Sequence, residues 1–160
     1  MAAPSATDRT AFRGVTVNRA TRAALLWAEE QLPAKDPAIQ LAQGSYNVGV
    51  AASAGTHDKG GVVDVRTRHL TPVQRTRLLR ALRDAGFAAW VRDERDGMPP
   101  HIHACIFGDG GQDMAAGARG QRLSYDAGRD GLRSNRADRN PYRPSPRVKW
   151  SWAKNRPVKR

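Results

Sequence analysis

The sequence predicts an α+β domain in which a small antiparallel sheet carries the functional site, two or three helices flank the sheet, and a basic irregular tail follows. Two observations predict the folded part: apolar stripes at helical spacing, and short β-branched or aromatic runs between them. The third observation is charge. From Arg119 to Arg160, thirteen Lys and Arg stand against three Asp, a net of +10 out of +12 for the whole chain.

These patterns divide the chain into three regions. Residues 1–13 are small and polar without periodicity, so we expect a disordered lead-in. Residues 14–128 form the domain that holds the site. Residues 129–160 are rich in Arg, Gly, Asn and Pro, and we expect a basic flexible tail because such a composition buries too little apolar area to offset the entropy of ordering.

Two helices are indicated by the signals at their ends. Asn18 or Thr16 can cap a helix that runs to about Leu32. The pair Thr71–Pro72 opens a second helix, whose apolar stripe ends at the C-cap glycine Gly86.

Short strands are indicated at residues 38–42, 62–65, 87–91 and 101–107. A charged loop joins the last two, so we expect them to form an antiparallel pair. A third, weaker helix is predicted over residues 113–127, where two glycines interrupt the pattern.

We expect neither a signal peptide nor a membrane span. The first ten residues lack the apolar stretch of a signal peptide, and no segment approaches the roughly 20 apolar residues of a membrane span. A single cysteine, Cys105, excludes an internal disulfide and a multi-cysteine zinc site.

Three of the four histidines lie in two short segments, and they point to a metal site. His57 sits in a glycine-rich loop that can approach an ion closely, and Asp64 follows it in a strand. His101 and His103 are two apart on a strand, so both face one cleft. Two histidines plus a carboxylate form a common ligand set for catalytic zinc. The fourth histidine, His69, is expected to be an ordinary surface or core residue.

The same segments resemble a known family. The segment His57–Asp64 is similar to the H-x-x-G-x-A-x-D motif of the D-alanyl-D-alanine carboxypeptidase and hedgehog-type zinc fold. His101–His103 resembles the H-x-H that this fold shares with lysostaphin-type peptidases. Gly86–Val91 resembles the strand before that pair in hedgehog-like members, and the whole similarity covers roughly residues 43–108.

The resemblance implies a role for each matched residue. His57, Asp64 and His103 would bind Zn²⁺, and His101 would assist catalysis or steady the transition state. Such a zinc ion makes an activated water available at neutral pH.

The general base and the substrate contacts are less tightly specified by the resemblance. Glu94 stands where hedgehog-like members carry their catalytic glutamate, and Asp93 and Asp96 are rivals for that role. The carboxypeptidases also place an arginine before the motif to meet the substrate carboxylate, and this chain has none there. We expect substrate contacts from that region, at Gln43, Ser45 and Tyr46.

The resulting expectation is a zinc metallopeptidase that cuts the peptide stem or cross-link of bacterial peptidoglycan. Because the arginine is missing, an endopeptidase fits better than a strict carboxypeptidase. Small members of this type are familiar as phage endolysins, so we expect the protein in the host cytoplasm before release to the cell wall, or on the virion. The basic tail could contact an anionic wall polymer.

Two other functions stay open at this stage. One is a zinc-binding module without turnover. The other is a nucleic-acid binder, although we do not expect nucleic acid to be the main partner. Its basis is the tail, where basic side chains alternate with aromatic ones that could stack on bases: Arg143, Arg147, Lys149 and Lys154 with Tyr142, Trp150 and Trp152.

Overall fold

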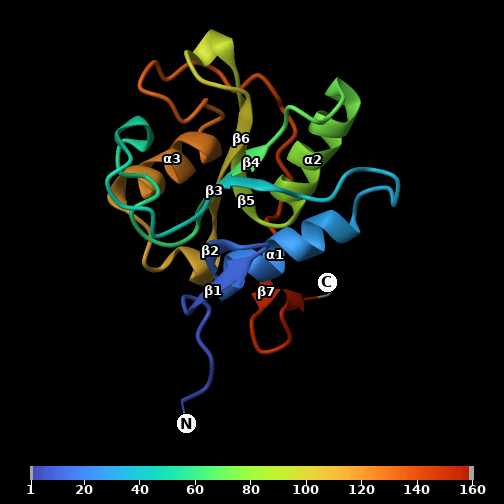
Figure 1. Ribbon diagram of the computed structural model, residues 1–160, viewed down its shortest axis with the longest axis vertical. Coiled ribbons are helices and arrows are strands. Elements are labelled where there is room, and N and C mark those ends of the chain that lie inside the picture. Colours follow the sequence, from blue (N-terminus) through green and yellow to red (C-terminus); the bar gives the residue numbers. More distant parts are fainter. Residues whose placement is uncertain (1, 159–160) are drawn as a thin grey trace.

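A computed structural model describes residues 2–158 and confirms the α+β class (Figure 1). The central sheet has four antiparallel strands in the order β3–β4–β6–β5: Leu41–Gln43, Val62–Arg66, His101–Ile106 and Phe87–Arg92. Three helices surround it: α1 (Arg19–Glu30), α2 (Pro72–Asp84) and α3 (Ala116–Asp126). None of the helices in the described part of the chain is long and apolar enough to cross a membrane.

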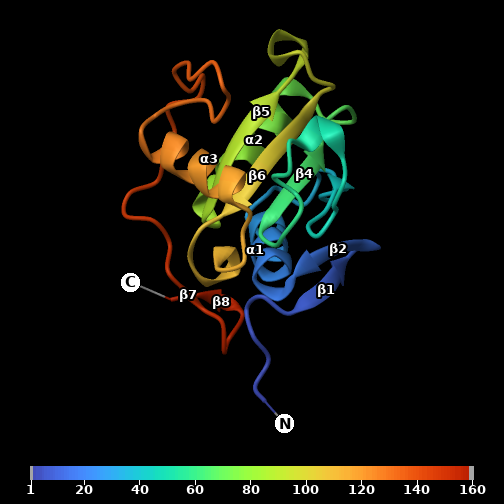
Figure 2. The same cartoon turned by 90° about the vertical axis from the view of Figure 1, so that its left-hand side faces the viewer.

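The helices cover both faces of the sheet. Figure 2 shows α3 in front of β5 and β6, with α2 behind them and α1 below α2. Side chains alternate between the two faces along β6: Ile102 and Ala104 are fully buried, whereas His103 reaches α3. The polar site therefore lies between the sheet and α3.

The predicted helix ends are confirmed. The Asn18 side chain accepts a hydrogen bond from the Thr21 amide at the start of α1. Thr71 and Gln74 form a capping box at the start of α2. After α2 the chain turns at Gly86, whose φ of +100° favours glycine. The expected antiparallel pairing of β5 with β6 is also present.

The expected disordered lead-in is wrong for its last residues. Arg9–Phe12 forms strand β1 and pairs with β2, Val15–Asn18. Arg13 and Gly14 make the two-residue turn, with φ of 48° and 82°. Phe12 is only 2% exposed, so burial of this ring helps to hold the hairpin on the core.

The segment after residue 128 is not a detached tail. It runs along the outer edge of β5 and ends in a small hairpin of β7 (Trp150–Ser151) and β8 (Arg156–Pro157). The Trp150 indole donates to the Ala85 carbonyl at 2.9 Å and its ring packs edge-on against Trp27. Hydrogen bonds and single tryptophans hold this segment on the domain. Such contacts need little apolar surface, and the low apolar content of the segment suggested a free tail.

Candidate metal centre

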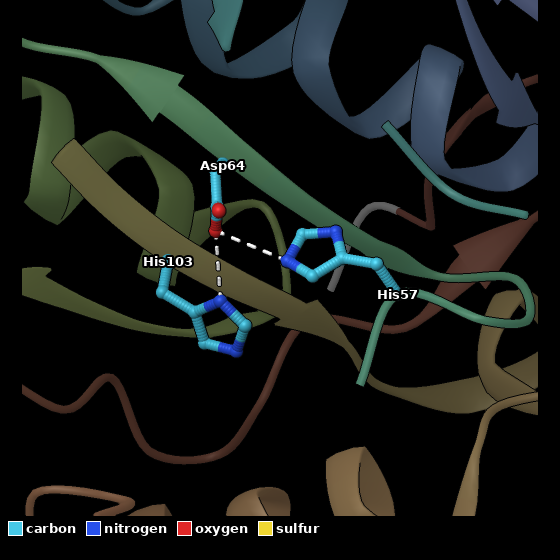
Figure 3. A group of neighbouring side chains, drawn as sticks. All are labelled: His57, Asp64 and His103. Carbon is cyan, nitrogen blue, oxygen red and sulfur yellow. Dashed lines mark hydrogen bonds and ion pairs between the residues drawn. The ribbon is translucent and has the colours of Figure 1, made fainter. Parts of the chain in front are cut away.

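The candidate site is built on three strands of the sheet. Asp64 on β4 lies opposite His103 on β6, and His103 lies opposite Trp90 on β5. His57 approaches from the loop before β4 (Figure 3). One ligand atom each of His57, Asp64 and His103 lies within 4.8 Å of the other two, so these residues are close enough to bind a metal ion. We name these three residues the His–Asp–His cluster.

The orientation of His57 is fixed by a backbone carbonyl. Its Nδ1 lies 2.9 Å from the Gly44 oxygen, which can only accept, so Nδ1 carries the proton. In the neutral ring, Nε2 then presents its lone pair to Asp64 Oδ1, 3.2 Å away. The ring is 1% exposed and cannot turn to water.

His103 is held in the opposite tautomer. Its Nε2 lies 2.8 Å from the Gln121 side-chain oxygen. The Gln121 amide nitrogen donates to the Gly131 carbonyl, which orients the amide so that its oxygen accepts from His103. The neutral ring therefore turns the Nδ1 lone pair to Asp64 Oδ1, at 2.8 Å. Trp90 stacks beside the ring, with centroids 6.3 Å apart.

These contacts place three hydrogen-bond acceptors face to face. Two imidazole lone pairs and a carboxylate repel one another unless a cation, either a proton or a metal ion, lies between them. Zinc bonds of about 2.0–2.1 Å would set tetrahedral ligand atoms about 3.3 Å apart, which fits the two measured separations within about half an ångström. A backbone or side-chain oxygen that orients each histidine is also typical of metal ligands.

The pKa directions of Asp64 and His103 agree with this need for a cation. Burial raises the pKa of Asp64, but hydrogen bonds from His103 and His57 outweigh burial and hold the pKa below its ordinary value. Burial lowers the pKa of His103, yet Cys105 and the Asp64 carboxylate outweigh it and raise the pKa to about 10. Both pKa directions mean that a positive charge beside the Asp64 carboxylate stabilises it.

The cluster opens into a cavity of about 670 Å³, and His101 lies at its edge as predicted. The His101 Nδ1 donates to the Pro99 carbonyl at 2.7 Å, because a carbonyl cannot donate. Its Nε2 points to the cluster and lies 3.7 Å from Asp64 Oδ1. In its neutral form His101 therefore offers a proton acceptor beside the His–Asp–His cluster.

The acidic residues expected to supply the general base are not brought to this cavity. Glu94 is exposed in the short 3₁₀ helix η2 (Glu94–Asp96), and among the described residues that line the cavity there is no Glu94, Asp93 or Asp96. Arg139 forms ion pairs with both aspartates. The loop from residue 93 to 100 carries these carboxylates away from β6.

Only one of the three expected substrate contacts lines the cavity. Gln43 does so, and it exchanges hydrogen bonds with Ser53. Ser45 is 2% exposed and its hydroxyl donates to the Val62 carbonyl, so it is structural. The Tyr46 hydroxyl donates to Asp113 at 2.8 Å, and Tyr46 lies outside the cavity lining of the described chain.

The glycines around His57 serve packing more than access to an ion. A Cβ on Gly60 would lie 2.7 Å from the Tyr46 hydroxyl, and one on Gly61 would lie 2.9 Å from Ile106. Gly61 also has a φ of +81°. The loop that carries His57 therefore lies tightly on its neighbours.

Sequence reasoning missed the groups that orient the histidines. Gln121 lies on α3, which was expected only to flank the sheet, and the other two are the carbonyls of Gly44 and Pro99. A backbone carbonyl has no signature in sequence. Gln121 is 18 residues from His103, so no local pattern links them.

Comparison with known proteins adds no relative to this picture. No protein-family model, no curated protein and no solved structure matches this chain. The family resemblance therefore stays a prediction, based on the two short motifs.

Proposed function

We propose that the protein is a zinc-dependent peptidase that hydrolyses a peptide bond in the stem or cross-link of bacterial peptidoglycan. The observation that carries the metal part is the convergence of two oppositely oriented histidines on one carboxylate oxygen. A His₂Asp set with room beside it is typical of catalytic zinc. The peptidoglycan part is supported by the resemblance of His57–Asp64 and His101–His103 to wall peptidase motifs.

Each residue of the site has its own chemical role in this proposal. His57, Asp64 and His103 would hold zinc, which supplies a Lewis acid and lowers the pKa of water. His101 accepts the proton of the attacking water at Nε2, because its Nδ1 is held by Pro99, and then returns the proton to the leaving amine. This assignment replaces Glu94, which lies outside the cavity lining of the described chain.

The test is the release of new amino groups from purified cell walls by zinc-loaded protein. We expect His101→Ala to lower the rate about 100-fold or more, the range for loss of a general base. Glu94→Gln should keep the wild-type rate, and a loss in that variant would return the base to Glu94. If wild-type protein with one equivalent of zinc releases nothing from any wall type, the peptidase proposal fails and a zinc module without turnover replaces it.

The nucleic-acid alternative is less well supported by the contacts of its residues. Arg143 and Arg147 form ion pairs with Asp138 and Asp126. Trp150 and Trp152 stack on each other, with centroids 4.9 Å apart. Groups that would contact phosphates and bases are thus partly occupied within the chain.

A further inference from the structure

We propose that the protein has a second binding site, which takes a phosphate-bearing polymer of sugar or polyol units. The site is a cleft of about 550 Å³ between α1, β1 and the C-terminal hairpin, and we name it the α1 cleft. Its described lining residues are Thr10, Arg19, Arg22, Ala23, Leu26, Trp27, Glu30, Asn155, Arg156, Pro157 and Val158. None of them lines the cavity of the His–Asp–His cluster, so the two sites can be tested separately.

One face of α1 forms a wall of this cleft along about three helical turns. The lining residues of the helix recur at helical spacing from Arg19 to Glu30, and at 1.5 Å per residue they span about 17 Å. The residues that α1 buries in the core, such as Ala24 and Leu25, are a different set. The hairpin of β7 and β8 lies beside the helix and forms the other wall (Figure 1). A groove of this length suits a chain better than a single ion.

The α1 cleft carries an excess of positive charge that the chain does not balance. In the described part of the chain, the side chains of Arg19 and Arg156 form no hydrogen bond and no ion pair. Arg22 donates only through its Nε, to the Ala11 carbonyl at 3.2 Å. Glu30 is the acidic lining residue, and it lies at the end of α1 opposite to Arg19. A cleft with this balance attracts an anionic ligand.

A phosphodiester is the anion that these arginines fit best. The planar guanidinium fork binds two phosphate oxygens through parallel N–H groups. In contrast to Arg143 and Arg147, whose guanidinium groups pair with aspartates, Arg19 and Arg156 keep their N–H groups available within the described chain. The α1 cleft is therefore the better phosphate site of the two basic surfaces.

The apolar lining of the α1 cleft favours sugar or polyol units over bases. Trp27 is partly exposed there, and its contact with Trp150 at 6.3 Å between centroids holds the ring in place. Together with Ala23 and Leu26 it offers apolar surface to the CH groups of such units. Proteins that bind single-stranded nucleic acid instead stack successive bases on several rings, and Trp27 is the single aromatic residue among the described lining.

The choice of a cell-wall polymer as the ligand rests on the proposed peptidase function. A phosphate polymer attached to the wall would hold the protein close to its peptide substrate. Two sites that bind the same material raise the effective concentration of the second one without any new contact in the first. The α1 cleft would therefore retain the protein on the wall while the cavity of the His–Asp–His cluster acts on the peptide.

The experiment measures the affinity of full-length protein for a short poly(glycerol phosphate) in about 0.15 M salt, where distant charges are screened. The double variant Arg19→Gln/Arg156→Gln should bind about tenfold more weakly, the size of one charge-assisted hydrogen bond or more. Each single variant should bind about threefold more weakly. Because neither side chain bonds the described chain, the double variant should unfold at the wild-type urea concentration.

The matched control is Arg75→Gln/Arg129→Gln, which loses the same charge from two arginines outside the lining of the α1 cleft. Its affinity should stay within about twofold of the wild-type value. No binding of the polymer, or an equal loss in the control, would overturn the proposal. Polyglutamate of the same charge that binds as tightly would also overturn it, because phosphate would then not be recognised. A single-stranded oligonucleotide with as many phosphates that binds more tightly would replace the wall polymer by nucleic acid.

This proposal and the peptidase function can fail separately, because binding is measured without hydrolysis. If poly(glycerol phosphate) binds at the α1 cleft but walls are not hydrolysed, only the peptidase function fails. If walls are hydrolysed but the polymer does not bind, only the second site fails.

Discussion

Two buried polar clusters in this molecule balance the charge of a buried carboxylate in opposite ways. In the His–Asp–His cluster, His57, Asp64 and His103 direct acceptors at one another, and the balancing cation must come from outside the chain. At the outer edge of β5, Arg83 supplies the cation itself, bound to Asp138 and to backbone carbonyls. The difference separates a cluster whose charges balance within the chain from one that is close enough to bind a metal ion.

The Arg83 cluster, in which Arg83 bonds Asp138 and backbone carbonyls, covers the edge strand β5. Arg83 donates to the Ala89 carbonyl on the edge strand and to the carbonyls of Asn140 and Tyr142 in the segment beyond it. The edge is thereby covered, which limits pairing with other chains. Burial lowers the pKa of Arg83 while Asp138 raises it, and the net direction is downward.

The largest predicted effect is therefore on stability. Arg83→Met removes five hydrogen bonds and leaves Asp138, whose side chain is 4% exposed, without its main partner. Loss of one partner of a buried ion pair is destabilising by about 3–5 kcal/mol. Urea unfolding followed by tryptophan fluorescence measures it, and Arg75→Met on the same helix should change the free energy of unfolding by under about 1 kcal/mol. Similar losses in both variants would show that the cluster contributes little.

The next largest effect is expected at the His–Asp–His cluster, which lacks a cation of its own. Zinc at 100 times its dissociation constant should raise the free energy of unfolding of the wild type by about 2.7 kcal/mol. His57→Ala should abolish this gain. His69→Ala should keep it, because His69 lines the same cavity outside the cluster. The gain is read from urea unfolding with zinc and with a chelator, and stabilisation that survives His57→Ala would place the ion elsewhere.

The third prediction concerns the side chain that orients His103. Gln121→Leu removes the acceptor for His103 Nε2, so the ring no longer has one fixed tautomer. Loss of such a partner lowers metal affinity about 10- to 100-fold. Competition with a coloured chelator measures it. Gln121→Glu keeps an acceptor and should restore most of the affinity, and Gln40→Leu, an exposed cavity residue, is the control. If Gln121→Leu binds zinc as the wild type does, the orienting role is wrong.

The sequence predicted features that depend on local patterns. Thr71 and Gln74 specify a helix start by themselves, and the alternation on β6 places His101 and His103 on one face. A sheet brings neighbouring strands to a fixed spacing, which explains why Asp64 lies beside His103. His57 reaches them from the loop that leads into β4.

The features it missed depend on contacts between distant segments. Glu94 was assigned from the resemblance to hedgehog-like members, but the fold of the loop decides where its carboxylate lies. The tail was judged by apolar content, whereas its anchor is Arg83, 55 residues from Asp138. A contact between distant segments leaves no periodic signal in the sequence, so the low apolar content alone suggested a free tail.

The smallest predicted effect lies in the loop after β5, where Arg95 and Arg139 bond Asp93. The hydrogen bonds from Arg95, together with Arg139, lower the pKa of Asp93 from 3.8 to about 2. Since the folded pKa is the lower one, the stabilisation is present above about pH 4 and is lost as the pH falls towards 2.

Asp93→Asn isolates this charge, because asparagine keeps the cap on the Arg95 amide. Water screens the pair, so the variant should lose under about 1 kcal/mol at pH 6, and the difference from wild type should shrink at pH 3. Urea unfolding at both values measures it, with the exposed Glu30→Gln as a control that stays constant. A difference that grows on acidification would mean that Asp93 does not act through its charge. A loss as large as that of Arg83→Met would erase the contrast between a screened pair and a buried one.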